Sequence, residues 1–136
     1  MKALTFPAFR PNGMAVELAE LLAVIPKNEL VWSIIDFYGI GEAPDNLSME
    51  EFEQSIRTKP GGFVMSWLEL KKFADRLEQT IDCVIIGAKS ELDILNANYV
   101  GDDFTSCEVV LRALDSTEWH VWARKETLVK KLASVY

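Results

Sequence analysis

The segment SCEVVLRALDSTEWHVWAR, residues 106–124, holds two apolar runs on either side of the polar corner Asp115-Ser116-Thr117. Both runs are rich in β-branched and aromatic residues, which favour strands, and the corner consists of residues common in turns. This pattern predicts a β-hairpin. It also places His120 and Trp122 on one face of the second strand, because alternate side chains of a strand point the same way.

Further helices and strands are predicted on both sides of this hairpin. Residues 30–38 and 80–87 are apolar runs typical of strands, and strict alternation in the first places Phe37 on the face opposite Trp32. Apolar residues recur at helical spacing in residues 14–25, 48–56, 66–77 and 126–134. The order of these elements predicts an α+β fold, a single domain over residues 1–136 in which about four mainly antiparallel strands pack with four helices.

Local signals indicate where some of these elements begin. Ser48 with Glu51, and Ser66 with Glu69, have the spacing of capping boxes, in which a hydroxyl and a carboxylate each accept a backbone amide. Prolines near the amino terminus argue against a helix there. Residues 91–103 fit either one or two helical turns or a loop.

The composition indicates a folded chain with an acidic surface. Hydrophobic residues make up 49% of the chain, enough for a core, and the formal net charge is -7. This charge argues against nucleic acid as a partner, because phosphates require Lys and Arg, and it fits a basic protein or solubility alone. The sequence contains neither a membrane-length apolar run nor a signal-peptide pattern. Cys83 and Cys107 are expected to be buried free thiols of a cytoplasmic protein.

Catalytic and metal-binding motifs are weakly represented. His120 is the single histidine, and because no motif links it to a nucleophile, a structural or surface role is favoured over that of a general base. The acidic segment at residues 93–108 lacks the spacing of a calcium loop, and Pro60-Gly61-Gly62 is too short to cradle a phosphate. We therefore expect no catalytic residue, no metal site and no cofactor.

Acidic residues are concentrated in two segments that contain no Lys or Arg, one between Lys27 and Arg57 and one between Lys89 and Arg112. If the loops in these segments converge, they form a surface that attracts a basic partner. The alternative, separate loops that keep the protein soluble, stays open. The candidate partner-binding residues are carboxylates and tyrosines of these segments: Asp36, Tyr38, Glu42, Asp45, Tyr99, Asp102 and Asp103.

Two segments of the second half resemble a known class of proteins. Residues 66–83, SWLELKKFADRLEQTIDC, read as a helix running into a strand, and residues 114–124, LDSTEWHVWAR, lead into a Lys-rich terminal helix. Together they resemble small bacterial immunity proteins that neutralise polymorphic or contact-dependent growth inhibition toxins. The resemblance implies a cytoplasmic protein that binds one cognate toxin domain, often a nuclease, and occludes its basic active-site region without turnover.

Two other functions stay open. A non-catalytic adaptor or regulatory module would share the acidic surface but bind a partner unrelated to any toxin. A small enzyme or ligand binder would instead use a pocket near His120 and Trp122. No pattern in the sequence predicts the oligomeric state.

Overall fold

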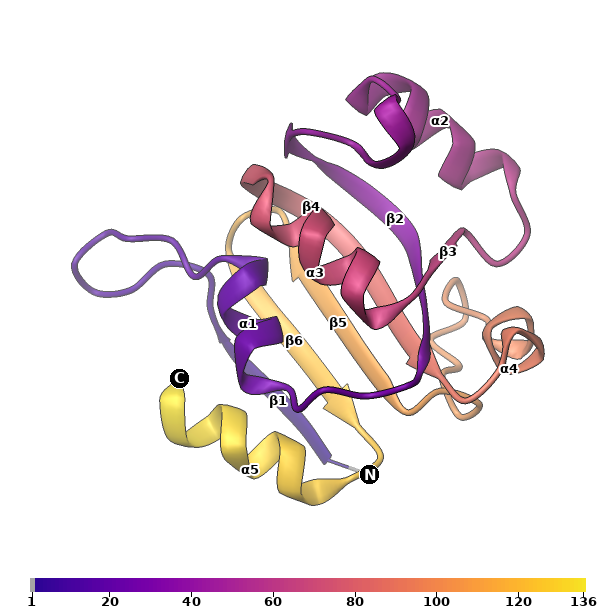
Figure 1. The fold of residues 1–136 in the computed structure, drawn as a ribbon. Coiled ribbons are helices and arrows are strands. Elements are labelled where there is room, and N and C mark those ends of the chain that lie inside the picture. The colour runs from indigo at the N-terminus through magenta and orange to yellow at the C-terminus, as the bar shows by residue number, and fades with distance from the viewer. Residues whose placement is uncertain (1) are drawn as a thin grey trace.

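The computed structural model, which describes residues 2–136, contains a six-stranded antiparallel sheet with five α-helices packed around it (Figure 1). The strands lie in the order β1-β6-β5-β4-β2-β3. They are β1 (Lys2–Pro7), β2 (Val31–Gly41), β3 (Phe63–Met65), β4 (Leu77–Ala88), β5 (Val109–Leu114) and β6 (Glu118–Ala123). The helices are α1 (Leu18–Val24), α2 (Met49–Thr58), α3 (Trp67–Asp75), α4 (Glu91–Asn96) and α5 (Glu126–Val135), and a 3-10 turn, η1, spans Pro44–Asn46.

The predicted α+β fold is confirmed, but the predicted numbers of strands and helices are too low. β1 forms in spite of its proline, because at the end of an edge strand a missing amide donor costs little. β3 has three residues, too few for an alternating pattern to reveal it. The additional helix is α4, which follows Ser90, whose hydroxyl accepts a hydrogen bond from the Asp93 amide at 3.2 Å.

Helix α1 begins later than its apolar periodicity predicts, at Leu18. The preceding residues fold back as a loop in which the Val16 amide donates to the Ala8 carbonyl at 2.7 Å. The chain turns into the helix at Glu17, whose amide donates to a carboxylate oxygen of Glu20 at 2.7 Å. The apolar residues before Leu18 therefore belong to the loop and not to the helix. The hydrogen bonds of Val16 and Glu17 determine where the helix begins.

The predicted hairpin is confirmed as β5 and β6, paired from Val109 opposite Ala123 to Leu114 opposite Glu118. At its corner Asp115 and Ser116 both adopt positive φ angles, 47° and 56°, as a tight hairpin turn requires. β4 pairs with the other side of β5, so the hairpin lies next to the longest strand of the sheet.

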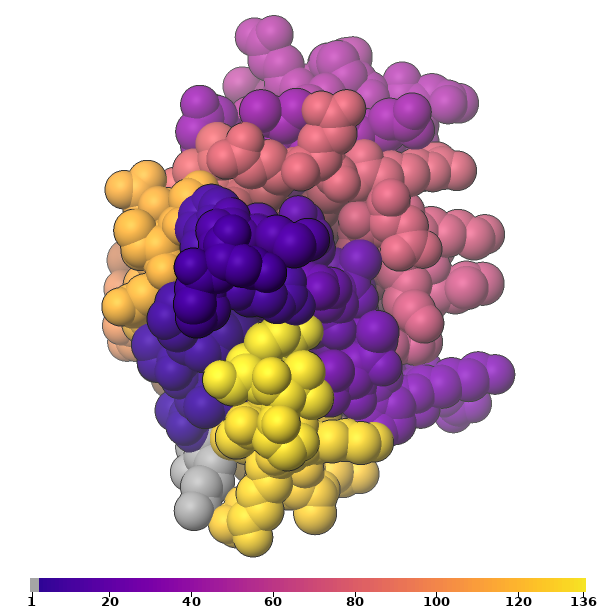
Figure 2. Space-filling model, turned by 90° about the vertical axis from the view of Figure 1, so that its left-hand side faces the viewer, coloured from indigo at the N-terminus to yellow at the C-terminus, as the bar shows by residue number. Residues whose placement is uncertain are grey.

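The main hydrophobic core lies between the sheet and helices α1, α2, α3 and α5 (Figure 1). Trp32 and Trp119 are buried there, and each indole N–H donates a hydrogen bond at 3.0 Å, to Asn28 and to the Val16 carbonyl respectively. Figure 2 shows α5, in yellow, against the indigo amino-terminal segment. The Tyr136 ring after α5 stacks on Phe6 with ring centroids 4.7 Å apart.

A second, smaller core covers one end of the opposite sheet face, where α4 and the loop of residues 97–108 pack on it. β2 contributes to both cores through a register shift between Ile34 and Asp36. This shift places Phe37 in the main core with Trp32, whereas Ile35 joins the second core, so the strict alternation predicted for β2 is wrong.

Candidate functional site

The part of this second sheet face beyond α4 is exposed, and we call it the open face. One row of side chains crosses it through paired positions on five strands: Thr5, His120, Arg112, Val84 and Asp36. Val84 is buried at the edge of the second core, and the other four side chains are exposed or partly exposed. The next row contains Glu118 opposite Leu114, and Asp82 opposite Tyr38. Neighbouring strands lie about 4.8 Å apart, so residues from distant parts of the sequence form one continuous surface.

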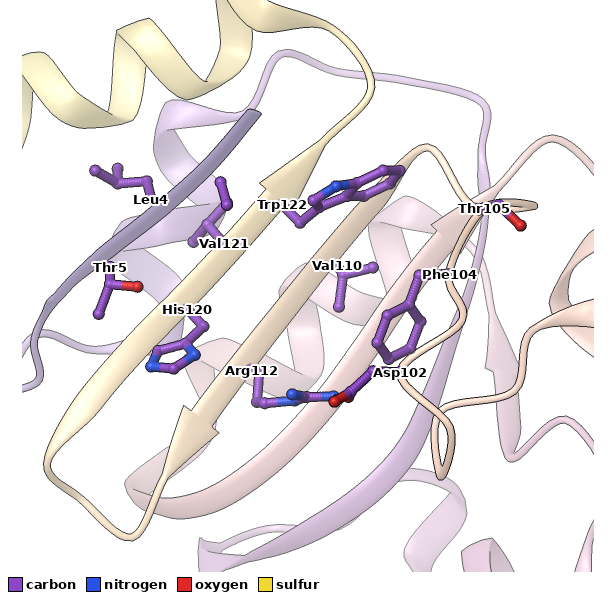
Figure 3. Close-up of a pocket in the computed structure, with 11 residues that line it drawn as sticks. Leu4, Thr5, Asp102, Phe104, Thr105, Val110, Arg112, His120, Val121 and Trp122 are labelled. Atoms are coloured by element: carbon purple, nitrogen blue, oxygen red, sulfur yellow. The ribbon is translucent and has the colours of Figure 1, made fainter. Parts of the chain in front are cut away.

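A shallow pocket of about 290 Å³ lies at one side of the open face (Figure 3). His120, Trp122 and Arg112 line it from the hairpin, and Phe104 and Asp102 line it from the loop of residues 97–108. In Figure 3, Arg112 extends across the sheet toward Asp102, while His120 lies nearer to β1. The pocket therefore combines an apolar wall with charged groups at its rim.

Two arginines, Arg112 on β5 and Arg124 directly after β6, hold the loop of residues 97–108 against the sheet. Arg112 donates to the Asp102 carboxylate at 2.9 Å, and its guanidinium lies 5.4 Å from the centre of the Phe104 ring. Arg124 donates to the Cys107 carbonyl at 2.9 Å and forms an ion pair with Glu108 at 2.9 Å. These contacts hold the carboxylate of Asp102 at the edge of the open face, although an exposed pair of this kind adds at most about 1 kcal/mol to stability.

His120 lies beside a carboxylate, because its Nε2 atom is 2.7 Å from Glu118 Oε2 and both side chains are partly exposed. An imidazole next to a carboxylate can accept a proton from a bound group. The two thiols of the chain do not supply a nucleophile for it. Cys83 is buried in the main core, where burial raises the pKa of its thiol to about 12, and burial also raises the pKa of Cys107.

Three of the predicted partner-binding residues belong to the open face. Asp36 is exposed and lies two strands from Arg112, Tyr38 is 55% exposed, and Asp102 reaches the face through Arg112. Asp103 and Tyr99 lie in the same loop and are also exposed. The Asp103 carboxylate accepts hydrogen bonds from the hydroxyl and the amide of Thr105, which lower its pKa.

The remaining two predicted residues lie away from this surface. Glu42 follows the last residue of β2 and forms a long ion pair with Arg76 at 3.9 Å. Asp45 lies in η1 with a positive φ of 57°. Because a strand rises about 3.3 Å per residue, Glu42 is roughly 20 Å along the chain direction from Asp36. The structure thus brings together part of the predicted set.

Sequence reasoning missed several members of the open face, above all Asp82, Glu118 and Leu114. Alternation along β4 and β6 signals which way these side chains point. Which strands lie side by side is a property of the sheet order, for which the sequence carries no local signal.

Among residues 2–136 there is no group of three or more His, Cys, Asp or Glu side chains placed to hold a metal ion. None of the helices in the described part of the chain combines the length and apolarity needed to cross a bilayer. Comparisons with protein-family models, with curated proteins and with solved structures find no match for this chain.

Proposed function

We propose that this chain is an immunity protein, which binds a cognate basic toxin domain through the open face and blocks its active-site region. The observation that supports the proposal is a gathering of carboxylates on this face. Asp36, Asp82, Glu118 and Asp102 come from four separate parts of the chain. Asp102 pairs with Arg112, and the other three carboxylates lie on strands no more than two positions from the strand of Arg112. A surface of this sign accelerates association with a basic partner and competes with the phosphates of a nucleic-acid substrate.

The same face carries groups that anchor protein interfaces. Tyr38 is 55% exposed and Leu114 is 37% exposed, although both are large side chains on strands that also supply the hydrophobic cores. Phe104 is partly buried beside Arg112, and Trp122 is partly buried beside Arg124. Aromatic and arginine side chains within a polar rim are the residue types that contribute most to binding energy at protein interfaces.

A small-ligand binder is the second candidate, and the pocket beside His120 is the observation that favours it. Its volume of about 290 Å³ is at the lower end of the range for ligand sites. Its guanidinium already pairs with Asp102, so a ligand anion would have to displace a carboxylate. This competition makes partner binding the better-supported function.

The test first asks whether the neighbouring reading frame encodes a secreted protein with a variable toxin domain, and then uses that domain as the partner. Size-exclusion chromatography should show a complex at about 50 mM salt that weakens at about 500 mM, because ionic screening reduces attraction between exposed charges. Co-expression should restore growth of cells that produce the toxin. Separate elution at low salt, with no protection of growth, would refute the proposal.

Variants locate the interface. Asp36→Lys with Glu118→Lys reverses charge on the open face and should abolish protection, because like charges then face the basic partner. The matched control is Asp75→Lys, an exposed carboxylate at the end of α3 on the helical side. It should protect as well as the unmodified chain.

A further inference from the structure

A second concave surface lies on the helical side of the sheet, at the end where β5 begins and β6 ends. It is a groove of about 940 Å³ between α5 and the segment of residues 25–30 that joins α1 to β2. Its apolar wall includes Ile25, Val109 and Leu128, which also belong to or pack against the main core. The groove is separate from the open face in both position and residues.

Lysines surround this groove. They come from the 25–30 segment, from the residue after β4, from the residue before α5 and from α5 itself: Lys27, Lys89, Lys125, Lys130 and Lys131. We call this set with its apolar wall the lysine groove. It holds five of the fourteen basic residues of a chain whose net charge is -7. Because like charges repel, such a concentration raises the energy of the empty groove and favours an anion inside it.

Three carboxylates lie in or beside the groove, those of Glu29, Glu108 and Glu126, which is too few to neutralise five lysines. Glu108 already pairs with Arg124 at 2.9 Å and with Lys89 at 3.4 Å, and its side chain is 16% exposed. Lys130 pairs with Glu126 at 3.6 Å, one helical turn away. Among the ion pairs of the described residues, none involves the three remaining lysines, Lys27, Lys125 and Lys131.

We propose that the lysine groove binds a small amphipathic anion, a molecule with an aliphatic body and one carboxylate. The body lies on Ile25, Val109 and Leu128, and the carboxylate accepts hydrogen bonds from the ammonium groups of the rim. α5 begins at this rim, so the positive end of its dipole adds to the attraction. The volume suits a drug-sized molecule and far exceeds that of an inorganic ion.

Titration calorimetry with octanoate tests the proposal, with 1-octanol and acetate as probes that carry the body or the charge alone. Octanoate should bind at least about tenfold more tightly than 1-octanol or acetate, because each of these two probes makes only one of the two interactions. In amide NMR spectra the largest shifts should fall on residues 25–30, 109 and 125–131. Equal affinity for the three probes, or shifts that centre on the open face, would overturn the proposal.

Charge variants separate recognition from general attraction. Lys27→Ala with Lys131→Ala should weaken octanoate binding by at least about tenfold, because two charge-assisted contacts are removed. The control pair is Lys71→Ala with Lys72→Ala on α3, which lies outside the groove. Equal loss in both pairs would show that net charge alone attracts octanoate and would refute a specific site. Circular dichroism establishes that each variant is folded.

Discussion

At the scale of single residues, burial decides the chemistry of Cys83. Its thiol is enclosed in the main core, and the loss of solvation of the thiolate raises its pKa from 9.0 to about 12. A buried thiol with this pKa is protonated at neutral pH and inaccessible to reagents. At pH 8, a disulfide reagent should therefore label Cys83 in the folded protein far more slowly than in denaturant. Rapid labelling of the native protein would contradict this burial.

The same shift predicts how stability depends on alkaline pH. The unfolded chain loses the Cys83 proton near pH 9 and the folded chain near pH 12, so stability is fully present below pH 9 and is lost as pH rises through this window. Urea unfolding should give a smaller free energy of unfolding at pH 10 than at pH 8. Cys83→Ala should reduce this difference between the two pH values, whereas a substitution at an exposed position, such as Lys72→Ala, should leave it unchanged.

At the scale of elements, the backbone of the hairpin corner is strained at Ser116, and a glycine at this position would relieve the strain. Ser116 adopts a φ of 56°, a region that glycine occupies without steric cost. Its amide donates to the Ile81 carbonyl at 2.9 Å, a bond that glycine retains. Ser116→Gly should therefore stabilise the protein by about 0.5–1 kcal/mol in urea unfolding.

Thr117→Gly is the matched control for that change. Thr117 is outside the positive-φ region, and its hydroxyl donates to the Leu114 carbonyl at 2.7 Å. Glycine at this position loses the bond and gains freedom in the unfolded chain, so this variant should be less stable. If both glycine variants destabilise the protein equally, the turn does not have the conformation described.

Helix α5 should depend strongly on one buried side chain. Leu132 is fully buried between α5 and the sheet, whereas its neighbour Lys131 is exposed. Leu132→Ala should lower the free energy of unfolding by about 2–5 kcal/mol, because it leaves a cavity. Lys131→Ala should change it by less than about 0.5 kcal/mol, and comparable losses in both would contradict the packing of this helix.

The elements predicted correctly are those with local causes. Both capping boxes form, with Ser48 and Ser66 each accepting the amide three residues later at 3.1 and 3.2 Å, and the hairpin forms from its own turn. Two of the features missed have distant causes. β1 exists because β6 offers it a partner, and the shift within β2 follows from its packing between two cores.

The candidate site was predictable to the same limited extent. Charge counting found Asp36 and Asp102, because acidic segments are visible in a sequence, and Tyr38 was selected as an aromatic residue within one of these segments. Charge counting also selected Glu42, which lies beyond the end of β2 and therefore far from Asp36 and Asp102. Asp82 and Glu118 join the site through strand neighbours far along the chain, which no local pattern reveals.

At the scale of the whole molecule, the charges are distributed unequally between two surfaces. The open face gathers carboxylates around Tyr38 and Leu114, whereas the lysine groove gathers ammonium groups around an apolar wall on the helical side. The two surfaces share no residue that we have assigned to binding. Each can therefore be altered without the other, which allows the two proposed activities to be tested in the same set of variants.

In toxin binding, the charged residues of the open face should mainly affect the association rate, and the aromatic residue Tyr38 should mainly affect the dissociation rate. Reversing the charge of Asp36 and Glu118 should slow association by about tenfold or more at low salt, because exposed charges guide the encounter of the two proteins. Tyr38→Ala should mainly accelerate dissociation, because an aromatic anchor contributes once the interface is formed. Surface plasmon resonance with immobilised toxin domain resolves both rates.

The lysine-groove pair, Lys27→Ala with Lys131→Ala, provides the internal control for these rates. Removing positive charge from the far side should leave dissociation unchanged and association nearly so, because screening limits such effects to about 10 Å at about 0.1 M salt. If this pair alters dissociation as much as Tyr38→Ala does, the partner contacts the helical side. The open face would then not be the toxin-binding surface, whatever the affinity of the complex.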